Sequence, residues 1–284
     1  MSKTRFGPAG NSQSFYDEGH KSSYEAPAWI AEKGLTWFEY SCGKGARIRP
    51  ETSQKIGQAA KDAGITMSIH APYYINFAST DAEKREKSKG YIHQTLDVAH
   101  HMGAKRVVFH PGSCGHISRS KALEIALNEL GELIDEIEEK GTDDVTLCPE
   151  TMGRIKQLGD LEETLTICEL NDKWLPTIDF GHLNARTLGG IKTEDDYKAI
   201  LDAIENRLGY ERMKKIHIHF SHIEYAKTGE KCHLTLEDTE YGPFFEPLAR
   251  QLVKRKMEAI VVCESKNVMA EDALKLKAMY EALL

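Results

Sequence analysis

The sequence lacks the features that mark secreted and membrane-spanning proteins. Its 284 residues contain no Cys-x-x-Cys pair and only six scattered cysteines: Cys42, Cys114, Cys148, Cys168, Cys232 and Cys263. This pattern is too sparse for a disulfide-stapled scaffold, so we interpret these residues as reduced thiols. No apolar run approaches the length of a membrane span, and the first residues contain no apolar signal segment. We therefore expect a cytoplasmic protein with no membrane partner and no obligate protein partner.

An excess of positive charge is also missing. The chain has 37 Lys and Arg residues against 44 Asp and Glu residues, which gives a formal net charge of −7. This balance excludes a basic protein that coats nucleic acid, although it allows a local electropositive site. The sequence contains no Gly-x-Gly-x-x-Gly or Walker-type phosphate loop, which argues against a nucleotide-binding open sheet. Its 40% hydrophobic and 29% charged residues are values typical of a globular protein.

Short apolar runs alternate with longer helical patterns along the whole chain. Eight runs are candidate strands: Arg5–Ala9, Leu35–Cys42, Ile65–Ala71, Arg106–His110, Val145–Glu150, Leu175–Phe180, Lys215–Phe220 and Ala259–Glu264. The clearest helix is expected from Ser118 to Lys140, where apolar residues recur at steps of three and four. Eight strand–helix units in one chain predict an α/β fold, a (β/α)₈ TIM barrel, as a single domain over residues 1–284. A doubly wound open sheet is the structural alternative.

Each of the last six strand candidates supplies a His, Asp or Glu residue at the same point of the strand–helix repeat. These residues are His70, His110, Glu150, Asp179, His217 and Glu264, separated by 40, 40, 29, 38 and 47 residues. Each step is one βα unit, and the carboxyl ends of barrel strands meet at one face, so we expect a single ring of side chains. Imidazole and carboxylate ligands without thiolate suit zinc, manganese or iron in a multi-metal site. Without bound cations, gathering these groups in one place would be unfavourable, because they lose hydration and their carboxylates repel one another.

The motifs around this ring resemble the endonuclease IV family of apurinic/apyrimidinic DNA repair enzymes, within the wider xylose isomerase-like barrels. The segments that carry the resemblance are His70-Ala-Pro-Tyr73-Tyr-Ile-Asn76, Phe109-His110-Pro-Gly-Ser113, Glu150-Thr-Met-Gly153, Asp179-Phe-Gly-His182 and Glu264. Their order and spacing together are specific, whereas His-Pro-Gly alone would be weak. The resemblance extends from Phe6 to Glu264.

The resemblance implies a cluster of three zinc ions, with Mn²⁺ or Fe²⁺ as alternatives. The implied ligands of the first ion are His70, His110 and Glu150. Glu150 would also bridge to the second ion, which is completed by Asp179, His217 and Glu264. The third ion would be held by His182 and His233. His219 shares a strand face with His217 because side chains alternate along a strand, so it is an alternative ligand.

The resemblance also implies an activity. A metal-bound hydroxide would hydrolyse the DNA phosphodiester 5′ to an abasic site, with Glu150 and Glu264 orienting the nucleophile. The implied partner is double-stranded DNA that contains abasic sites. Tyr73 matches a family position on a loop that enters the duplex, and ordinary packing at the barrel rim is the other interpretation. A divalent-metal-dependent sugar isomerase or epimerase of the same barrel superfamily is the alternative function.

One position departs from the family pattern. The family supplies an aspartate two residues before the second histidine of the third site, whereas this chain reads Gly229-Glu-Lys231-Cys-His233. A protonated lysine has no lone pair to offer a metal ion. The sequence therefore predicts two tightly held ions and a third site that is weak, empty or rebuilt by His219 or His222.

Overall fold

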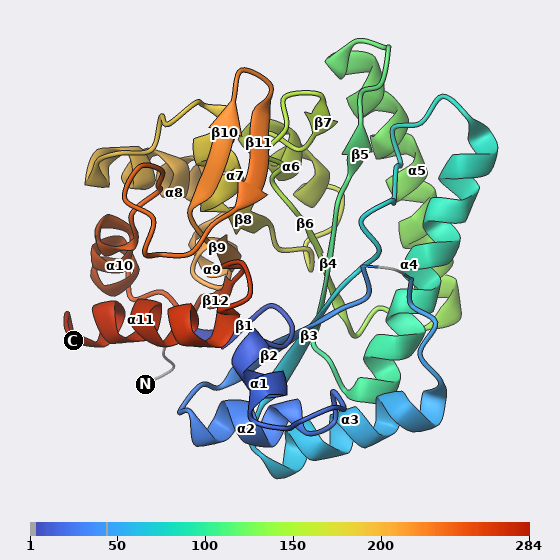
Figure 1. Ribbon diagram of the computed structural model, residues 1–284. Helices are drawn as coiled ribbons and strands as arrows, with labels where there is room; N and C mark the ends of the chain where they lie inside the picture. The colour runs from blue at the N-terminus through green and yellow to red at the C-terminus, as the bar shows by residue number, and fades with distance from the viewer. Residues whose placement is uncertain (1–3, 44) are drawn as a thin grey trace.

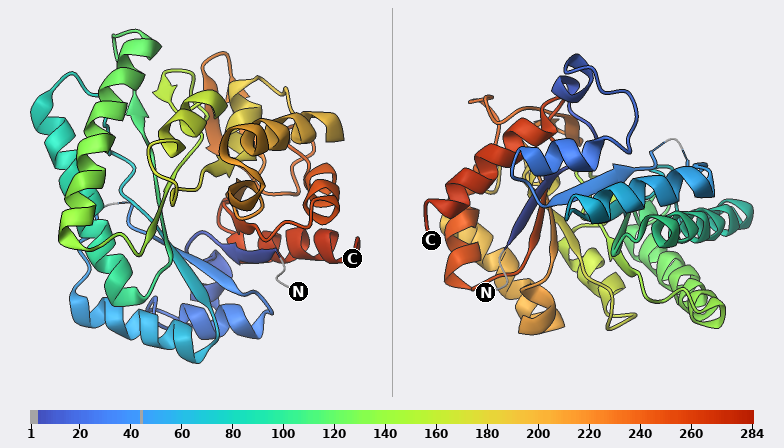
Figure 2. Two further views of the ribbon diagram at one scale, coloured as in Figure 1. Left: turned by 180° about the vertical axis from the view of Figure 1, so that it is seen from behind. Right: turned by 90° about the horizontal axis from the view of Figure 1, so that it is seen from below.

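The computed structural model describes residues 4–43 and 45–284, which form a (β/α)₈ barrel (Figures 1 and 2). Its eight parallel strands are β1 (Arg5–Pro8), β2 (Trp37–Ser41), β3 (Thr66–His70), β4 (Arg106–Phe109), β6 (Thr146–Pro149), β8 (Thr177–Asp179), β9 (His217–Phe220) and β12 (Ile260–Cys263). Each lies inside one of the eight runs expected from the sequence. The predicted barrel is therefore confirmed, and the open-sheet alternative is wrong.

The barrel wall consists of two four-stranded parallel sheets. Their strand orders are β1-β12-β9-β8 and β2-β3-β4-β6. Single parallel bridges close the two seams, one between Ala9 and Glu39 and the other between Glu150 and Thr177. Each seam thus includes a glutamate, and both glutamates are 1% exposed. The seams fix two buried carboxylates by backbone pairing.

Helices follow the strands and cover the outside of the barrel (Figure 2). Their bounds are α1 (Gln13–Asp17), α2 (Ala26–Glu32), α3 (Pro50–Asp62), α4 (Ala82–Met102), α5 (Arg119–Lys140), α6 (Leu161–Cys168), α7 (Phe180–Arg186), α8 (Glu194–Leu208), α9 (Tyr210–Met213), α10 (Phe245–Lys254) and α11 (Met269–Glu281). The Ser118 side chain accepts a hydrogen bond from the Lys121 amide at the start of α5, and Gly141 ends the helix in the left-handed conformation. No helix in the described ranges is long and apolar enough to cross a membrane.

The interior of the barrel is more polar than the layer between strands and helices. Along β2, Phe38 packs into the main hydrophobic core, whereas Trp37 belongs to a separate small cluster with Ile260 and Val262. Because alternate residues face opposite sides of a strand, Glu39 shares the inner side with Trp37. The barrel interior therefore holds ionisable groups among a few apolar side chains.

Two small ribbons extend the loops that follow the strands. β10 (Ile223–Ala226) and β11 (Gly229–His233) form an antiparallel hairpin after β9, seen beyond the strand ends in Figure 1. β5 (Gly112–Ser113) pairs with β7 (Gln157–Leu158) and joins the loops that follow β4 and β6. These ribbons order the loops at the carboxyl ends of the strands.

Gly7 is required by a close approach between β1 and β2. A Cβ atom at this position would lie 1.9 Å from the Trp37 carbonyl oxygen, which is backbone and cannot move aside. We expect Gly7→Ala to lower the free energy of unfolding by about 1–3 kcal/mol or more, measured by urea denaturation. The matched control is Gly90→Ala within α4, where a Cβ meets no atom within 4 Å; it should raise stability by about 0.5–1 kcal/mol. Equal stability of both variants would contradict the packing described.

Candidate metal centre

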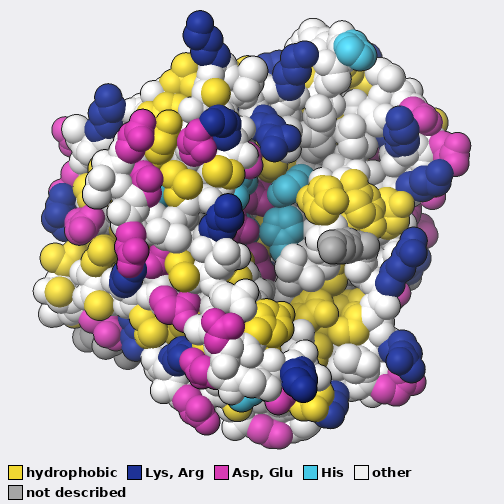
Figure 3. Space-filling model, viewed as in Figure 1, with side chains coloured by type: hydrophobic (Ala, Val, Ile, Leu, Met, Phe, Trp, Pro, Cys, Tyr) yellow, Lys and Arg dark blue, Asp and Glu magenta, His cyan; other side chains and the backbone are white. Residues whose placement is uncertain are grey.

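The carboxyl ends of the barrel strands surround a cavity of about 340 Å³. Histidine side chains lie at the bottom of this hollow, and hydrophobic and basic side chains border it (Figure 3). The lining includes six expected ligands and one unexpected carboxylate, namely His70, His110, Glu150, His182, His233, Glu264 and Glu230. These strand-end side chains thus gather in a single polar site.

The first candidate group consists of His70, His110 and Glu150, whose ligand atoms lie within 4.8 Å of one another. Glu150 Oε2 is 3.1 Å from Nε2 of each histidine. His70 Nδ1 donates to the Ala71 carbonyl over 2.8 Å, which leaves Nε2 turned to the site. Burial lowers the pKa of His70, but the hydrogen bond and charge of Glu150 outweigh burial and raise the pKa to about 9. Without a metal ion, a protonated His70 therefore balances the negative charge of Glu150.

The second group combines Glu150, Asp179, His219 and Glu264, again within 4.8 Å. His219 Nδ1 lies 3.0 Å from Glu150 and 3.4 Å from Glu264. Asp179 is fully buried, its Oδ2 atom has no hydrogen-bond partner, and burial raises the pKa of Asp179 to about 6. A buried carboxylate oxygen without a donor is a costly arrangement that a bound cation would relieve. The second group thus fits a divalent ion.

His217 does not belong to this second group, so its expected place beside Asp179 and Glu264 is wrong. The parallel register between β8 and β9 pairs Asp179 with His219 and Thr177 with His217. A two-residue step moves a side chain about 6–7 Å along a strand, one layer deeper into the barrel. His217 instead lies 3.0 Å from Glu39. The alternation along the strand places both histidines on the same face but does not fix which of them is level with Asp179.

The third group contains His182, His233 and Glu230, the last of which was not expected from the sequence. Glu230 Oε2 lies 3.5 Å from His182 Nε2. His182 Nδ1 donates to the Thr151 carbonyl over 2.9 Å, and Ser221 Oγ is 2.8 Å from His233 Nδ1. These contacts hold both imidazoles and leave His182 Nε2 facing the carboxylate.

A β-bulge explains how Glu230 replaces the expected aspartate. In the hairpin register, Glu224 pairs with Cys232 and Tyr225 pairs with Glu230, so Lys231 is an extra residue. In a regular strand, residues three apart face opposite sides, and one inserted residue returns Glu230 to the side of His233. Lys231 points away and forms an ion pair with Glu224. The expectation that the third site lacks a carboxylate is therefore wrong.

Two arginines shape the loop that follows β6 and lines one side of the cavity. Arg186 donates to the carbonyls of residues 152, 154, 155 and 157, and Arg119 donates to those of 155 and 157. Arg119 also pairs with Glu163. The clamped loop places Arg154 and Gln157 in the cavity lining. A basic side chain is thus held next to the candidate metal groups despite the negative net charge.

Tyr73 lies in the cavity lining and is 63% exposed. Its ring contacts Tyr74 edge to face, at a centroid distance of 5.7 Å. Because most of the ring is accessible, Tyr73 is not a packing residue of the core. This position suits contact with a bound molecule.

A family model described as "Xylose isomerase-like TIM barrel" matches residues 27–281. The chain belongs to this family. A relative in Methanocaldococcus jannaschii, named "Uncharacterized protein MJ0133", is 36% identical over 283 residues, covering 98% of this chain and 97% of that protein. A "Probable endonuclease 4" of Mycoplasma pneumoniae is 29% identical over 160 residues, covering 55% of this chain and 53% of the relative. The chain thus aligns with about half the length of that second relative.

Two solved structures share the fold of this chain. Endonuclease IV from Thermus thermophilus has a TM-score of 0.68 and 21% identity, covering 98% of both chains. D-psicose 3-epimerase, crystallised with D-fructose, has a TM-score of 0.66 and 15% identity, covering 93% of this chain and 94% of the other. The resemblance to endonuclease IV is confirmed, but the fold alone does not choose between these two activities.

Replacing Glu230 tests the third group. We expect Glu230→Gln to reduce the zinc content of the dialysed protein by about one ion per chain, because the neutral amide loses the charge that favours a cation. Elemental analysis by mass spectrometry measures this. The matched control is Lys231→Ala, which should leave the zinc content unchanged because Lys231 faces Glu224. A loss of zinc in the control alone would contradict the bulge geometry.

Asp179 should destabilise the metal-free protein and stabilise the loaded one. Because the charged form of Asp179 is disfavoured by burial, we expect Asp179→Asn to melt no lower than the parent protein in EDTA. A ligand present at 1,000 times its Kd stabilises by about 4 kcal/mol, and the variant should show a clearly smaller gain on adding zinc. Thermal melts with and without zinc measure both effects. An equal zinc-induced gain would exclude Asp179 as a ligand.

Proposed function

We propose that this protein is a zinc-dependent phosphodiesterase that cleaves DNA 5′ to abasic sites. The observation that carries this proposal is the sharing of Glu150 between two adjacent ligand groups, with a third group next to them. A carboxylate that bridges two ions is a recurring device of phosphoester hydrolysis. The similarity to endonuclease 4 proteins supports the same reaction class.

The residues present fit divalent ions. We assign the first ion to His70, His110 and Glu150, and the second to Glu150, Asp179, His219 and Glu264; the third falls to His182, Glu230 and His233. Histidine-rich sets with carboxylates and no thiolate favour Zn²⁺, while Mn²⁺ and Fe²⁺ remain compatible with the ligands. When bound, such ions supply Lewis acidity and lower the pKa of water.

The side chains around these groups suit a phosphate-containing substrate. Glu150 and Glu264 both reach the cavity and would hold the attacking water by accepting its protons. Burial opposes ionisation, yet His219 and the other histidines hold the pKa of Glu150 well below its usual range, so this group stays an acceptor. Arg154 would attract the phosphate, and Tyr73 would stack against a base or fill the abasic gap.

The size of the cavity restricts how DNA would bind. About 340 Å³ admits one nucleotide turned out of the helix but not an intact duplex. An abasic site, which has no base to unstack, is the least costly nucleotide to turn out. Placing the proposed substrate in the cavity would therefore cost less than placing a nucleotide of undamaged DNA there.

A direct assay separates the two candidate functions. The zinc-loaded protein is incubated with a duplex that carries one tetrahydrofuran abasic analogue, and the cleavage position is mapped against size markers. We expect a single cut 5′ to the analogue, with no cut in an undamaged duplex of the same sequence. In parallel, ketohexoses are tested for epimerisation at C3. Sugar turnover without DNA cleavage would overturn the proposal in favour of the epimerase alternative.

Glu150→Gln tests the bridging carboxylate. We expect cleavage to fall by at least two or three orders of magnitude, because the amide retains the volume but loses the charge and the second anionic oxygen. The rate is measured by single-turnover cleavage of the abasic duplex. The control is Glu240→Gln, an exposed glutamate outside the cavity lining, which should retain full activity. If Glu150→Gln kept activity near that of the parent protein, Glu150 would have only a structural role at the end of its strand.

A further inference from the structure

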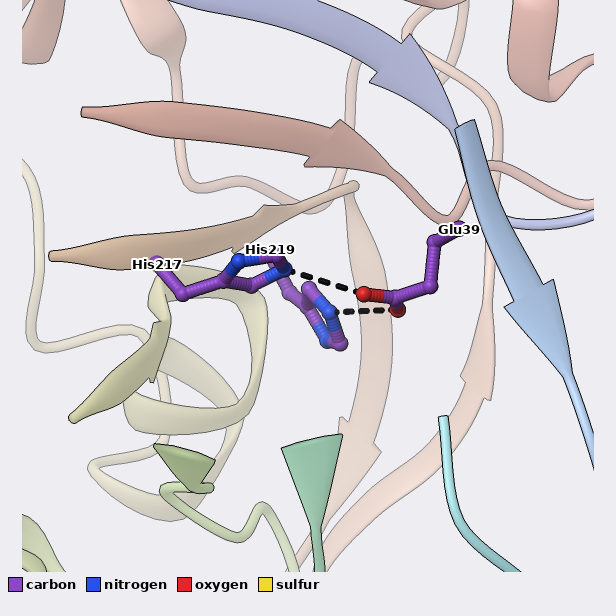
Figure 4. Close-up of side chains that lie close together, drawn as sticks. All are labelled: Glu39, His217 and His219. Atoms are coloured by element: carbon purple, nitrogen blue, oxygen red, sulfur yellow. Dashed lines mark ion pairs between the residues drawn. The ribbon is translucent and has the colours of Figure 1, made fainter. Parts of the chain in front are cut away.

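A second set of ionisable side chains lies beneath the candidate metal centre, inside the barrel. It consists of Glu39, His217 and His219, which come from β2 and β9 (Figure 4). Both histidines are fully buried and Glu39 is 1% exposed. Glu39 and His217 are not in the lining of the cavity. These groups therefore do not face a substrate, yet they reach the site through His219.

The two imidazoles converge on the carboxylate of Glu39. His219 Nε2 lies 2.9 Å from Oε1, and His217 Nε2 lies 3.0 Å from Oε2. Ser68 Oγ donates to Oε2 over 2.7 Å and accepts from Trp37 Nε1 over 2.8 Å. Apart from these close contacts, Glu39 Oε1, His217 Nε2 and His219 Nε2 have no hydrogen-bond partner among the described residues. The distances nevertheless leave no room for a water molecule between the partners.

Arg106 determines which nitrogen of His217 carries the proton. Arg106 Nη1 contacts His217 Nδ1 at 3.4 Å, and the guanidinium is held in place because Nη2 donates to the Lys215 carbonyl. A guanidinium can only donate, so Nδ1 accepts and the proton of a neutral His217 lies on Nε2. The N–H of a neutral His217 then faces Glu39, whose Oε2 lies 3.0 Å from Nε2.

The position of the proton on His219 follows in the same way from the partners of its two ring nitrogens. Glu39 is an acceptor, because the Ser68 hydroxyl, which accepts from Trp37 Nε1, donates to Oε2, and the Nε2 atoms of both imidazoles lie within 3.0 Å of the carboxylate. His219 Nε2 therefore carries a proton toward Oε1 of Glu39. The lone pair of a metal-binding His219 is then on Nδ1, the atom that lies 3.0 Å from Glu150 and 3.4 Å from Glu264.

Other histidines of the site receive the same support from the backbone. His70 Nδ1 donates to the Ala71 carbonyl, and His182 Nδ1 donates to the Thr151 carbonyl. His219 presents its nitrogens the other way round, with Nδ1 to the site. Its Nε2 has Glu39 where those two imidazoles have a carbonyl oxygen. A carboxylate also increases the basicity of the ligand more than a neutral carbonyl does.

We propose that Glu39 is a positioning residue that orients His219 for the second metal ion, and that His217 and Arg106 orient Glu39 in turn. This inference rests on the metal centre of the proposed function. The alternative is a further ion held by Glu39, His217 and His219 themselves. That ion would need a lone pair on Nε2 of His217, which would put the proton on Nδ1 against an Arg106 donor. The arginine therefore favours direct pairing of both imidazoles with Glu39 over a bound ion.

Glu39→Gln is the first test. The amide keeps the volume but offers one acceptor oxygen to the three donors that meet Glu39, namely Ser68 Oγ, His217 Nε2 and His219 Nε2. We expect the affinity for one zinc ion per chain to fall by about 10–100-fold, as for other supporting partners of metal-bound histidines. Competition with a chromophoric chelator measures the affinities of the whole protein. Circular dichroism and melting in EDTA check that the variant folds.

A matched pair at His217 separates a supporting role from a ligand role. In His217→Gln the side-chain N–H can still donate to Glu39 and the oxygen can still accept from Arg106, whereas His217→Leu can do neither. We expect zinc affinity close to that of the parent protein for the first variant and, for the second, the loss of about 10–100-fold. Loss of a whole ion in both variants would overturn the proposal and establish His217 as a ligand.

The tautomers provide a readout that does not depend on activity. Long-range ¹H–¹⁵N spectra of the zinc-loaded, histidine-labelled protein should show His219 and His217 both protonated at Nε2, and His219 bound to metal through Nδ1. Coordination of His219 through Nε2, or unchanged zinc affinity in Glu39→Gln, would overturn the proposal. If the parent protein binds zinc with the expected Glu39 dependence but does not cleave abasic DNA, only the proposed reaction fails. If it cleaves DNA and Glu39→Gln keeps full affinity, only the positioning role fails.

Discussion

The structure of the site depends on one buried carboxylate, Glu150. The residue is 1% exposed and is fixed by the bridge to Thr177 that closes the barrel between β6 and β8. Its two oxygens lie 3.0 Å from His219 Nδ1 and 3.1 Å from Nε2 of both His70 and His110. An isolated charge at this depth would be strongly destabilising, so the neighbouring imidazoles must donate protons to Glu150 or a cation must bind there. Closure of the barrel and composition of the site are therefore coupled at one residue.

Two layers of ionisable groups share the inside of the barrel. The upper layer contains Asp179 and His219, paired in register, and the lower layer contains Glu39 and Ser68, likewise paired. His219 belongs to both layers, because one ring nitrogen faces Glu150 and the other faces Glu39. The rigid wall sets the spacing of the layers, since neighbouring strands fix each residue by backbone hydrogen bonds. A substitution in the lower layer therefore changes the orientation of His219 at the candidate metal centre, although the substituted side chain contacts no substrate.

The loops contribute what the strands cannot. The bulge in β11 turns Glu230 toward His182 and His233, and the arginine clamp of Arg119 and Arg186 fixes the loop that carries Arg154. Both devices act on backbone that has no regular partner in the barrel wall. Through the bulge and the clamp, a fold that is shared by a whole family carries metal-ligand candidates and cavity-lining residues that depend on local loop structure. The fold explains where chemistry occurs, and these local devices decide which groups take part in it.

The sequence by itself determined the barrel and the position of its active face. Eight apolar runs and the regular spacing of the strand-end residues suffice for this, because strand length and side-chain alternation are local properties. His70, His110, Glu150 and Glu264 were placed in one site on that basis. Only the tertiary structure decided that His219 rather than His217 is level with Asp179, because register depends on the neighbouring strand. Likewise, the inserted Lys231 reverses the side on which Glu230 lies, and a bulge of this kind leaves no periodic signal in the sequence.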